Sequence, residues 1–86
     1  MEDKIFLEIV ELPSIHPSTW YKRCRKWSKN DNKENKNVRK VRRRGLDVWE
    51  VEVNLAIRYM EEKCREYTTE AKKIQAGIDT LKAIYK

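Results

Sequence analysis

Residues 17–44 concentrate the positively charged side chains of this 86-residue chain. Twelve Lys and Arg stand there against two acidic residues, Asp31 and Glu34, which leaves a net charge of +10. The whole chain carries 20 Lys and Arg against 14 Asp and Glu, a net charge of +6, so this block holds more than the entire excess. Many guanidinium and ammonium groups together can bind phosphates, and a folded basic patch of this density favours a polyanionic partner.

Other residue types that could carry chemistry are few. Cys24 and Cys64 lie far apart, each on an apolar stripe, which is typical of small buried hydrophobic residues. A zinc site needs four ligands, usually with paired cysteines, and His16 is the single histidine, so we expect no metal and no other cofactor. The acidic pairs Glu50/Glu52 and Glu61/Glu62 are close neighbours on a strand or helix, and such pairs are ordinarily solvated surface residues and not catalytic groups. His16 lies in a turn without a nucleophile, where it fits a helix cap or a phosphate contact, so we expect no enzyme activity.

The length and the apolar runs limit the cellular location. A chain of 86 residues forms a small domain that buries only about 60–65% of its unfolded surface. No stretch reaches the roughly 18 apolar residues of a membrane helix. Glu2 and Asp3 precede the first apolar run, where a signal peptide would carry positive charge. We therefore expect a cytoplasmic protein with no membrane partner.

Residues 4–17 predict a short helix followed by a tight turn. Ile5, Ile9 and Leu12 fall on one helical face of residues 4–11, although the β-branched content leaves a strand open for part of this segment. Pro13 ends the element, because the residue before a proline is disfavoured in the α region. Pro17 suits the first turn of a second helix.

That second helix is predicted over residues 17–28. Trp20, Cys24 and Trp27 recur at i, i+4 and i+7 and predict its buried stripe. The opposite side carries Ser18, Lys22, Arg25 and Lys29, flanked by Thr19, Tyr21 and Lys26. No carboxylate occurs between residues 17 and 30, so the helix presents donors without competing acceptors.

The next two segments predict a loop and a β-hairpin. Residues 28–37 are polar, without an apolar anchor, and indicate a mobile loop. Residues 38–53 predict a hairpin with a three-residue loop at 45–47. This register pairs Val41 with Val51, Arg42 with Glu50 and Lys40 with Glu52. It places opposite charges across the strands and lets Arg43 stack on Trp49, whereas a two-residue loop with Val41 against Glu50 is less favourable.

Residues 54–86 predict one long helix of about 50 Å, with Asn54 as its N-cap. Its apolar positions are Ile57, Met60, Cys64, Tyr67, Ala71, Ile74, Ile78, Leu81 and Tyr85. They alternate in steps of three and four, which is a heptad seam. We expect this seam to pack on a partner helix, either a second copy in a homodimer or another protein. A helix that folds back on its own domain is the alternative.

Together these elements predict an α+β, mostly helical fold: a winged helix-turn-helix over residues 1–53, with a two-stranded hairpin wing, followed by a long amphipathic helix over 54–86. An exposed basic helix has the width of the DNA major groove. An arginine-rich hairpin tip can lie on phosphates or in a narrow minor groove.

Two short segments carry a resemblance to known families. The stretch Glu11-Leu12-Pro13-Ser14-Ile15-His16-Pro17-Ser18, the basic helix ending at Trp27, and Arg44-Gly45-Leu46-Asp47-Val48-Trp49-Glu50-Val51 are together similar to the N-terminal winged-helix DNA-binding domain of phage Mu-type transposases and repressors. The layout, with Pro17-Ser18-Thr19-Trp20 at the second helix, also resembles MerR and excisionase winged helices. The long polar loop at 28–37 departs from the Mu-type pattern, as does the helix that replaces its second leucine-proline after the wing.

The resemblance and the charge pattern lead to the same expectation, which is double-stranded DNA binding. The resemblance implies a phage or mobile-element role in transposition, repression or excision, in the bacterial cytoplasm or nucleoid or in a phage-infected host. The expected DNA-binding residues are Ser18, Thr19, Tyr21, Lys22, Arg25, Lys26, Lys29, Lys40, Arg42, Arg43 and Arg44. Arg25 is the first candidate for a guanine contact. A protein-interaction adaptor acting through the heptad helix, or an RNA-binding protein, stays open as an alternative.

Overall fold

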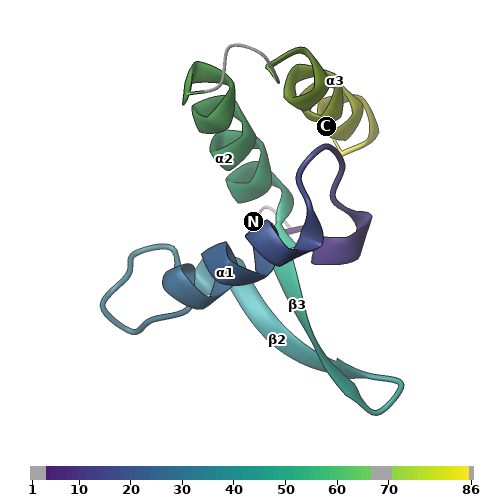
Figure 1. Cartoon of the computed structure of the whole chain (residues 1–86). Helices are drawn as coiled ribbons and strands as arrows, with labels where there is room; N and C mark the ends of the chain where they lie inside the picture. Colours follow the sequence, from purple (N-terminus) through teal and green to yellow (C-terminus); the bar gives the residue numbers. More distant parts are fainter. Residues whose placement is uncertain (1–3, 67–70, 86) are drawn as a thin grey trace.

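Three short strands and three helices make up this computed structural model, which describes residues 4–66 and 71–85 (Figure 1). In chain order the elements are β1 (Phe6–Glu8), a 3-10 turn (Ile9–Glu11), α1 (Pro17–Trp27), a second 3-10 turn (Asn35–Asn37), β2 (Val38–Arg43), β3 (Leu46–Glu52), α2 (Val53–Glu66) and α3 (Ala71–Ile84). The described residues thus form a small α+β fold with three α-helices and one antiparallel sheet of three strands.

The helix expected over residues 4–11 is wrong, because this segment forms β1 and a single 3-10 turn. β1 pairs antiparallel with β3, with Leu7 opposite Val51, so the strand order is β1-β3-β2. The backbone N–H of Val53 also donates to the carbonyl of Ile5 at 2.9 Å. Leu7 is buried while its neighbours Phe6 and Glu8 are only half-buried, which is the alternation of a strand. The sheet therefore has one strand more than the expected two-stranded hairpin.

The β2–β3 hairpin is present, but its predicted register is wrong. The observed partners are Val38 with Val51, Arg39 with Glu50, Lys40 with Trp49, Val41 with Val48, Arg42 with Asp47, and Arg43 with Leu46. The loop has two residues, Arg44 and Gly45, both with positive φ (54° and 78°), as a type I′ turn requires. This turn shifts β2 by three positions against β3, so Lys40 rather than Arg43 lies beside the Trp49 ring.

The predicted core stripe of α1 is confirmed. Trp20 and Cys24 are fully buried and Trp27 is nearly so. They belong to the same buried cluster as Leu7, Val38 and Val51, which project from one face of the sheet. The ring of Tyr59 from α2 joins this cluster, with its centroid 5.1 Å from that of Trp20 and 5.5 Å from that of Trp27. These aromatic contacts connect α1 to α2.

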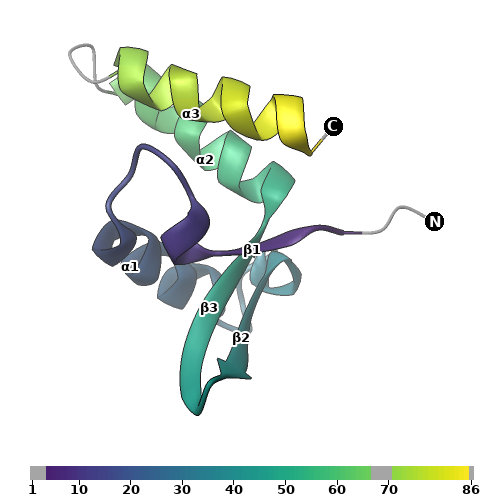
Figure 2. The same cartoon turned by 90° about the vertical axis from the view of Figure 1, so that its right-hand side faces the viewer.

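The single long helix expected over residues 54–86 is wrong. Two helices, α2 and α3, lie side by side as a helical hairpin above the sheet (Figure 2). The longest dimension of the described residues is 36 Å, shorter than the continuous helix would be. The cap also differs: α2 begins at Val53, and the carboxylate of Glu52 accepts hydrogen bonds from the Leu55 N–H (2.9 Å) and the Asn54 amide (3.0 Å). None of the described helices is both long and apolar enough to cross a membrane.

The polar segment 28–37 is a loop, as expected, but polar contacts anchor it. Glu34 accepts a hydrogen bond from the Asn37 side chain at 2.7 Å and forms an ion pair with Arg58 of α2 at 3.4 Å. The side chain of Asn37 in turn accepts from the Lys4 ammonium at 2.9 Å. The loop is thus fastened both to α2 and to the start of the chain.

Gly77 lies where α3 approaches the turn before α1. A Cβ at this position would contact Ser14 Oγ, and it would lie 3.1 Å from Ser14 Cβ and 2.9 Å from Met60 Cε. Ser14 has little freedom to move away, because its hydroxyl donates to the Lys73 carbonyl at 2.7 Å. The glycine therefore permits close packing of α3 on the turn and on α2.

We expect Gly77→Ala to destabilise the protein by roughly 1 kcal/mol in urea unfolding, because the overpacking cost of about 1–3 kcal/mol exceeds the gain of about 1 kcal/mol in helix propensity. In a Ser14→Gly background the same substitution is expected to be stabilising. Ser14 has a φ of 72°, which glycine adopts freely, and the atoms of its side chain no longer obstruct the new methyl group. Only the flexible end of the Met60 side chain then has to move. The same sign in both backgrounds would contradict this packing argument.

Candidate nucleic-acid interface

The N-terminus of α1 is built by the Pro-Ser-Ile-His-Pro turn. Pro17 occupies the first helical position, where its missing N–H is least needed. The Nδ1 atom of His16 accepts a hydrogen bond from the Ser18 N–H at 3.1 Å and lies 2.9 Å from the Ser18 hydroxyl oxygen. Of the two roles expected for His16, a helix cap or a phosphate contact, the structure shows the helix cap.

The outer face of α1 carries donors and cations. The exposed side chains are Ser18, Thr19, Tyr21, Lys22, Arg25 and Lys26, with Lys29 just beyond the C-terminus. The Arg25 guanidinium lies 5.9 Å from the centre of the Tyr21 ring, close enough for a cation–π contact. The helix contains no acidic residue, so its positive charge is not neutralised from within.

An open groove of about 600 Å³ separates α1 from the hairpin. Its lining comprises Lys22, Arg25, Lys26, Ser28 and Lys29 from the helix side and Lys40 and Trp49 from the hairpin. Five of these seven residues are cations and none is acidic. The Lys40 ammonium lies 5.3 Å from the centre of the Trp49 ring. This arrangement makes the groove attractive to an anionic ligand along its length.

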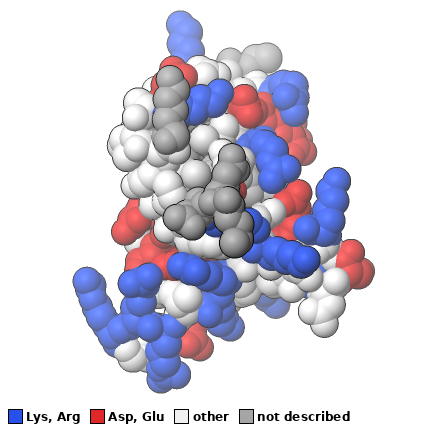
Figure 3. All heavy atoms as spheres, turned by 180° about the vertical axis from the view of Figure 1, so that it is seen from behind, with Lys and Arg blue, Asp and Glu red and all other residues white. Residues whose placement is uncertain are grey.

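The hairpin divides its cations between its two faces. Lys40 and Arg42 share the face of Trp49, toward the groove, whereas Arg39 and Arg43 lie on the other face around Glu50. Arg42 donates to the Gly45 carbonyl at 3.3 Å and lies 3.9 Å from Asp47. Seen from behind, Lys and Arg side chains gather over the free end of the hairpin (Figure 3).

Glu50 is a buried carboxylate held by two arginines. Its side chain is 2% exposed, and it accepts hydrogen bonds from Arg39 and Arg43, each at 2.6 Å. Arg43 also pairs with Glu8 of β1 at 3.1 Å. Burial raises the pKa of Glu50, but the hydrogen bonds and charges of the two arginines outweigh it, so the pKa lies below its ordinary value. The hydrogen bond to Glu50 likewise raises the pKa of Arg43.

The structure therefore separates two kinds of arginine on the hairpin. Arg43, expected from the sequence among the DNA-binding residues, holds β2, β3 and β1 together through Glu50 and Glu8, although its side chain is half exposed. Arg42 and Arg44 are exposed at the end of the hairpin. Trp49, expected only as the stacking partner of Arg43, lines the groove, and its Nε1 is buried without a hydrogen-bond partner in the described part of the chain.

The expected partner-helix seam lies inside this chain. Its described members in α2 and α3 are Ile57, Met60, Cys64, Ala71, Ile74, Ile78 and Leu81, all buried or half-buried, and Tyr85, just after α3, is half-buried against the same core. Tyr67 lies outside the described residues. The steps of three and four therefore reflect packing within one chain. This packing joins two helices, whereas the alternative to a partner helix was a single helix folded back on its own domain.

The cysteines occupy the apolar positions expected for them. Burial raises the pKa of the Cys24 thiol to about 12, so this group is unreactive at neutral pH. Cys64 is half-buried, and its thiol donates to the Ala71 carbonyl at 3.6 Å. Within residues 4–66 and 71–85, no three His, Cys, Asp or Glu side chains gather in a group that could hold a metal ion.

Comparison with known proteins adds no identification. No protein-family model matches the sequence, and no curated protein or solved structure matches it either. The resemblance to Mu-type and MerR-type winged helices therefore stays a prediction. Because fold likeness would not establish a role in any case, the function has to be inferred from the groove and its charges.

Proposed function

We propose that this protein binds double-stranded DNA through the groove between α1 and the β2–β3 hairpin. The observation that carries the proposal is the lining of that groove, which has five cations from α1, the residues just after it and β2, and no carboxylate. Phosphate contacts of this kind supply most of the affinity of proteins for DNA. The DNA-binding residues expected from the sequence are all exposed on α1, just after it, or on the hairpin, and among them Arg43 is already paired with Glu50 and Glu8.

The shape of the surface favours a duplex as the ligand. α1 is an exposed helix, and the hairpin extends away from the body beside it (Figures 1 and 2). The major groove of B-DNA is about 12 Å wide and admits one helix. With α1 in that groove, the hairpin acts as a wing on the adjacent backbone or minor groove. Arg25, exposed on α1, is our candidate for a guanine contact.

The biological role that we propose rests on the resemblance of the sequence alone. It is a regulator or DNA-binding module of a phage or mobile element, acting in transposition, repression or excision in the bacterial cytoplasm. The experiment below tests DNA binding and not this role.

The double substitution Arg25→Ala/Lys40→Ala is expected to weaken duplex binding and to flatten its salt dependence. The slope of log K against log salt should fall by roughly 0.9 for each phosphate that the variant no longer neutralises. Fluorescence anisotropy with mixed-sequence duplexes across a salt series measures both quantities. Single-stranded RNA of equal charge serves as competitor, and duplex binding that it abolishes would favour the RNA-binding alternative.

Lys72→Ala/Lys73→Ala is the matched control, because it removes the same charge from exposed positions on α3. We expect this control to retain nearly the wild-type slope. Equal slopes for the two double variants would mean that net charge, and not the groove, drives binding. Absence of duplex binding by the wild type at low salt would overturn the proposal.

A further inference from the structure

The basic surface of α1 continues past the groove to a second hollow, which lies against α2. This hollow has a volume of about 170 Å³ and is lined by Thr19, Lys22, Arg23, Lys26 and Tyr59. Lys22 and Lys26 also line the groove, so the two depressions adjoin across the helix. No acidic side chain of the described residues lines the second hollow. The sequence pattern did not single out Arg23 or Tyr59.

Arg23 is held in place by aromatic rings. Its guanidinium carbon lies 4.8 Å from the centre of the Tyr59 ring and 5.7 Å from that of Trp27. Among the ion pairs of the described residues, none involves Arg23. A guanidinium that is oriented by stacking and not neutralised by a carboxylate has its N–H donors available for an anion.

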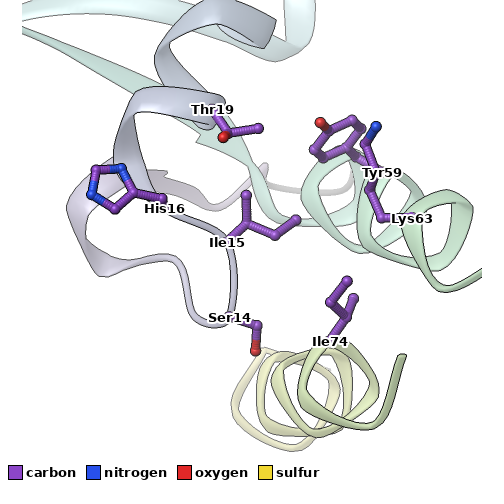
Figure 4. A pocket seen from close by; sticks show the side chains of 7 residues that line it. All are labelled: Ser14, Ile15, His16, Thr19, Tyr59, Lys63 and Ile74. Carbon is purple, nitrogen blue, oxygen red and sulfur yellow. The ribbon is translucent and has the colours of Figure 1, made fainter. Parts of the chain in front are cut away.

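Tyr59 brings a hydroxyl to the same place. The residue is 4% exposed, and its ring is packed against Trp20 and Trp27. It lines the second hollow and also a neighbouring one of about 260 Å³, where Thr19 of α1 lies across from Tyr59 and Lys63 of α2 (Figure 4). No hydrogen bond between described residues engages the Tyr59 hydroxyl. A polar group on an otherwise buried side chain gains most from a ligand that accepts its proton.

We infer that the hollow between α1 and α2 is a phosphate-binding site, with Arg23 and Lys26 as its charges and the Thr19 and Tyr59 hydroxyls as neutral donors. The inference rests on the proposed DNA binding for its ligand, which is a backbone phosphodiester next to those bound in the groove. The phosphates would thus run from the hairpin across α1 to α2. Such a contact orients the duplex without reading its sequence.

Titration with inorganic phosphate, at constant ionic strength kept with chloride, tests the site without DNA. We expect saturable changes in the amide NMR signals of Thr19, Arg23 and Tyr59. Tyr59→Phe keeps the ring and removes only the hydroxyl, so it should weaken phosphate binding roughly tenfold, the value of one hydrogen bond to a charged group. The melting midpoint of each variant verifies that the fold is retained.

Duplex binding of the same variants identifies the source of the phosphate. Arg23→Gln should lower the salt slope by roughly 0.9, whereas Tyr59→Phe should weaken binding and leave the slope unchanged because no charge is removed. Lys72→Gln, on α3, is the control and should bind duplex as the wild type does.

The outcomes separate this inference from the proposed function. Phosphate-induced changes at the hollow without any duplex binding would retain the site but reject DNA as its ligand. Duplex binding that neither Arg23→Gln nor Tyr59→Phe alters, together with unchanged NMR signals in phosphate, would overturn the inference and leave the groove as the DNA-binding surface.

Discussion

Replacing Trp20 by Ala is expected to lower the free energy of unfolding by about 3–5 kcal/mol. Trp20 is completely buried, and its ring contacts Tyr59, so it joins α1 to α2. A domain of 86 residues has a total stability of roughly 4–13 kcal/mol. The substitution should therefore remove a large part of the stability. Urea unfolding followed by circular dichroism measures the change.

Two further variants show whether burial is the cause. Tyr21→Ala changes an aromatic residue on the same helix that is 46% exposed, and it should cost less than about 1 kcal/mol. Trp20→Phe keeps most of the apolar volume and removes an Nε1 that is buried without a partner among the described residues. Its cost should lie well below that of Trp20→Ala. Equal unfolding midpoints for Trp20→Ala and Tyr21→Ala would refute the assignment of the helix faces.

The double substitution Arg39→Ala/Arg43→Ala is expected to destabilise the protein by about 3–5 kcal/mol at pH 7, because it leaves the Glu50 carboxylate buried and without its partners. Glu50→Gln should cost less, about 1–3 kcal/mol, since the two arginines are half exposed and can return to water. Urea unfolding compares the two. Arg42→Ala/Arg44→Ala removes the same charge from the hairpin without touching Glu50, and we expect it to cost less than about 1 kcal/mol.

The contribution of Glu50 to the free energy of unfolding should depend on pH with opposite signs in the wild type and in Arg39→Ala/Arg43→Ala. The pKa of Glu50 is lower in the folded state than in the unfolded chain, so its contribution is present above the unfolded pKa and disappears as the pH falls through the folded pKa. Without the arginines, burial alone would raise that pKa, and protonation would then stabilise the variant. The difference in unfolding free energy between wild type and Arg39→Ala/Arg43→Ala should therefore shrink from about pH 5 downward. A difference that stays constant from neutral pH into the acid range would mean that Glu50 is not the group responsible.

Local patterns predicted α1 and its two faces correctly. Proline at the first turn, a buried stripe at i, i+4 and i+7, and a face without carboxylates are all properties of eleven consecutive residues. The hairpin position was also predictable, since Gly45 follows a β-rich run. These features depend only on residues that are close in the sequence. For this reason the basic face of α1, which lines one side of the groove, could be predicted.

The register of the hairpin was not predictable from side-chain pairing. The run Val38-Arg39-Lys40 is followed by Val41-Arg42-Arg43, so a shift of three positions again places a valine opposite Val51 and an arginine opposite Glu50. Charge and apolar pairing therefore cannot distinguish the two registers. The two-residue turn decides between them, and it needs a non-glycine residue, Arg44, at positive φ. A shift of β2 by an odd number of positions moves its side chains to the opposite face of the sheet. The turn therefore also decides that Lys40 lies beside Trp49.

The heptad seam shows the same division between local and tertiary information. The steps of three and four establish which residues of α2 and α3 are apolar, but they are identical for a helix that meets a partner and for two helices that meet each other. The formation of β1 also depends on residues distant in the chain, since its three residues become a strand by pairing with the edge of β3. The amino-acid pattern alone thus determined the basic face, the core stripe and the place of the hairpin. The conformation of the Arg44-Gly45 turn decided the register. Contacts between residues distant in the chain decided the helical hairpin and the Glu50 cluster, because local energies that are equal for two arrangements leave the choice to tertiary packing.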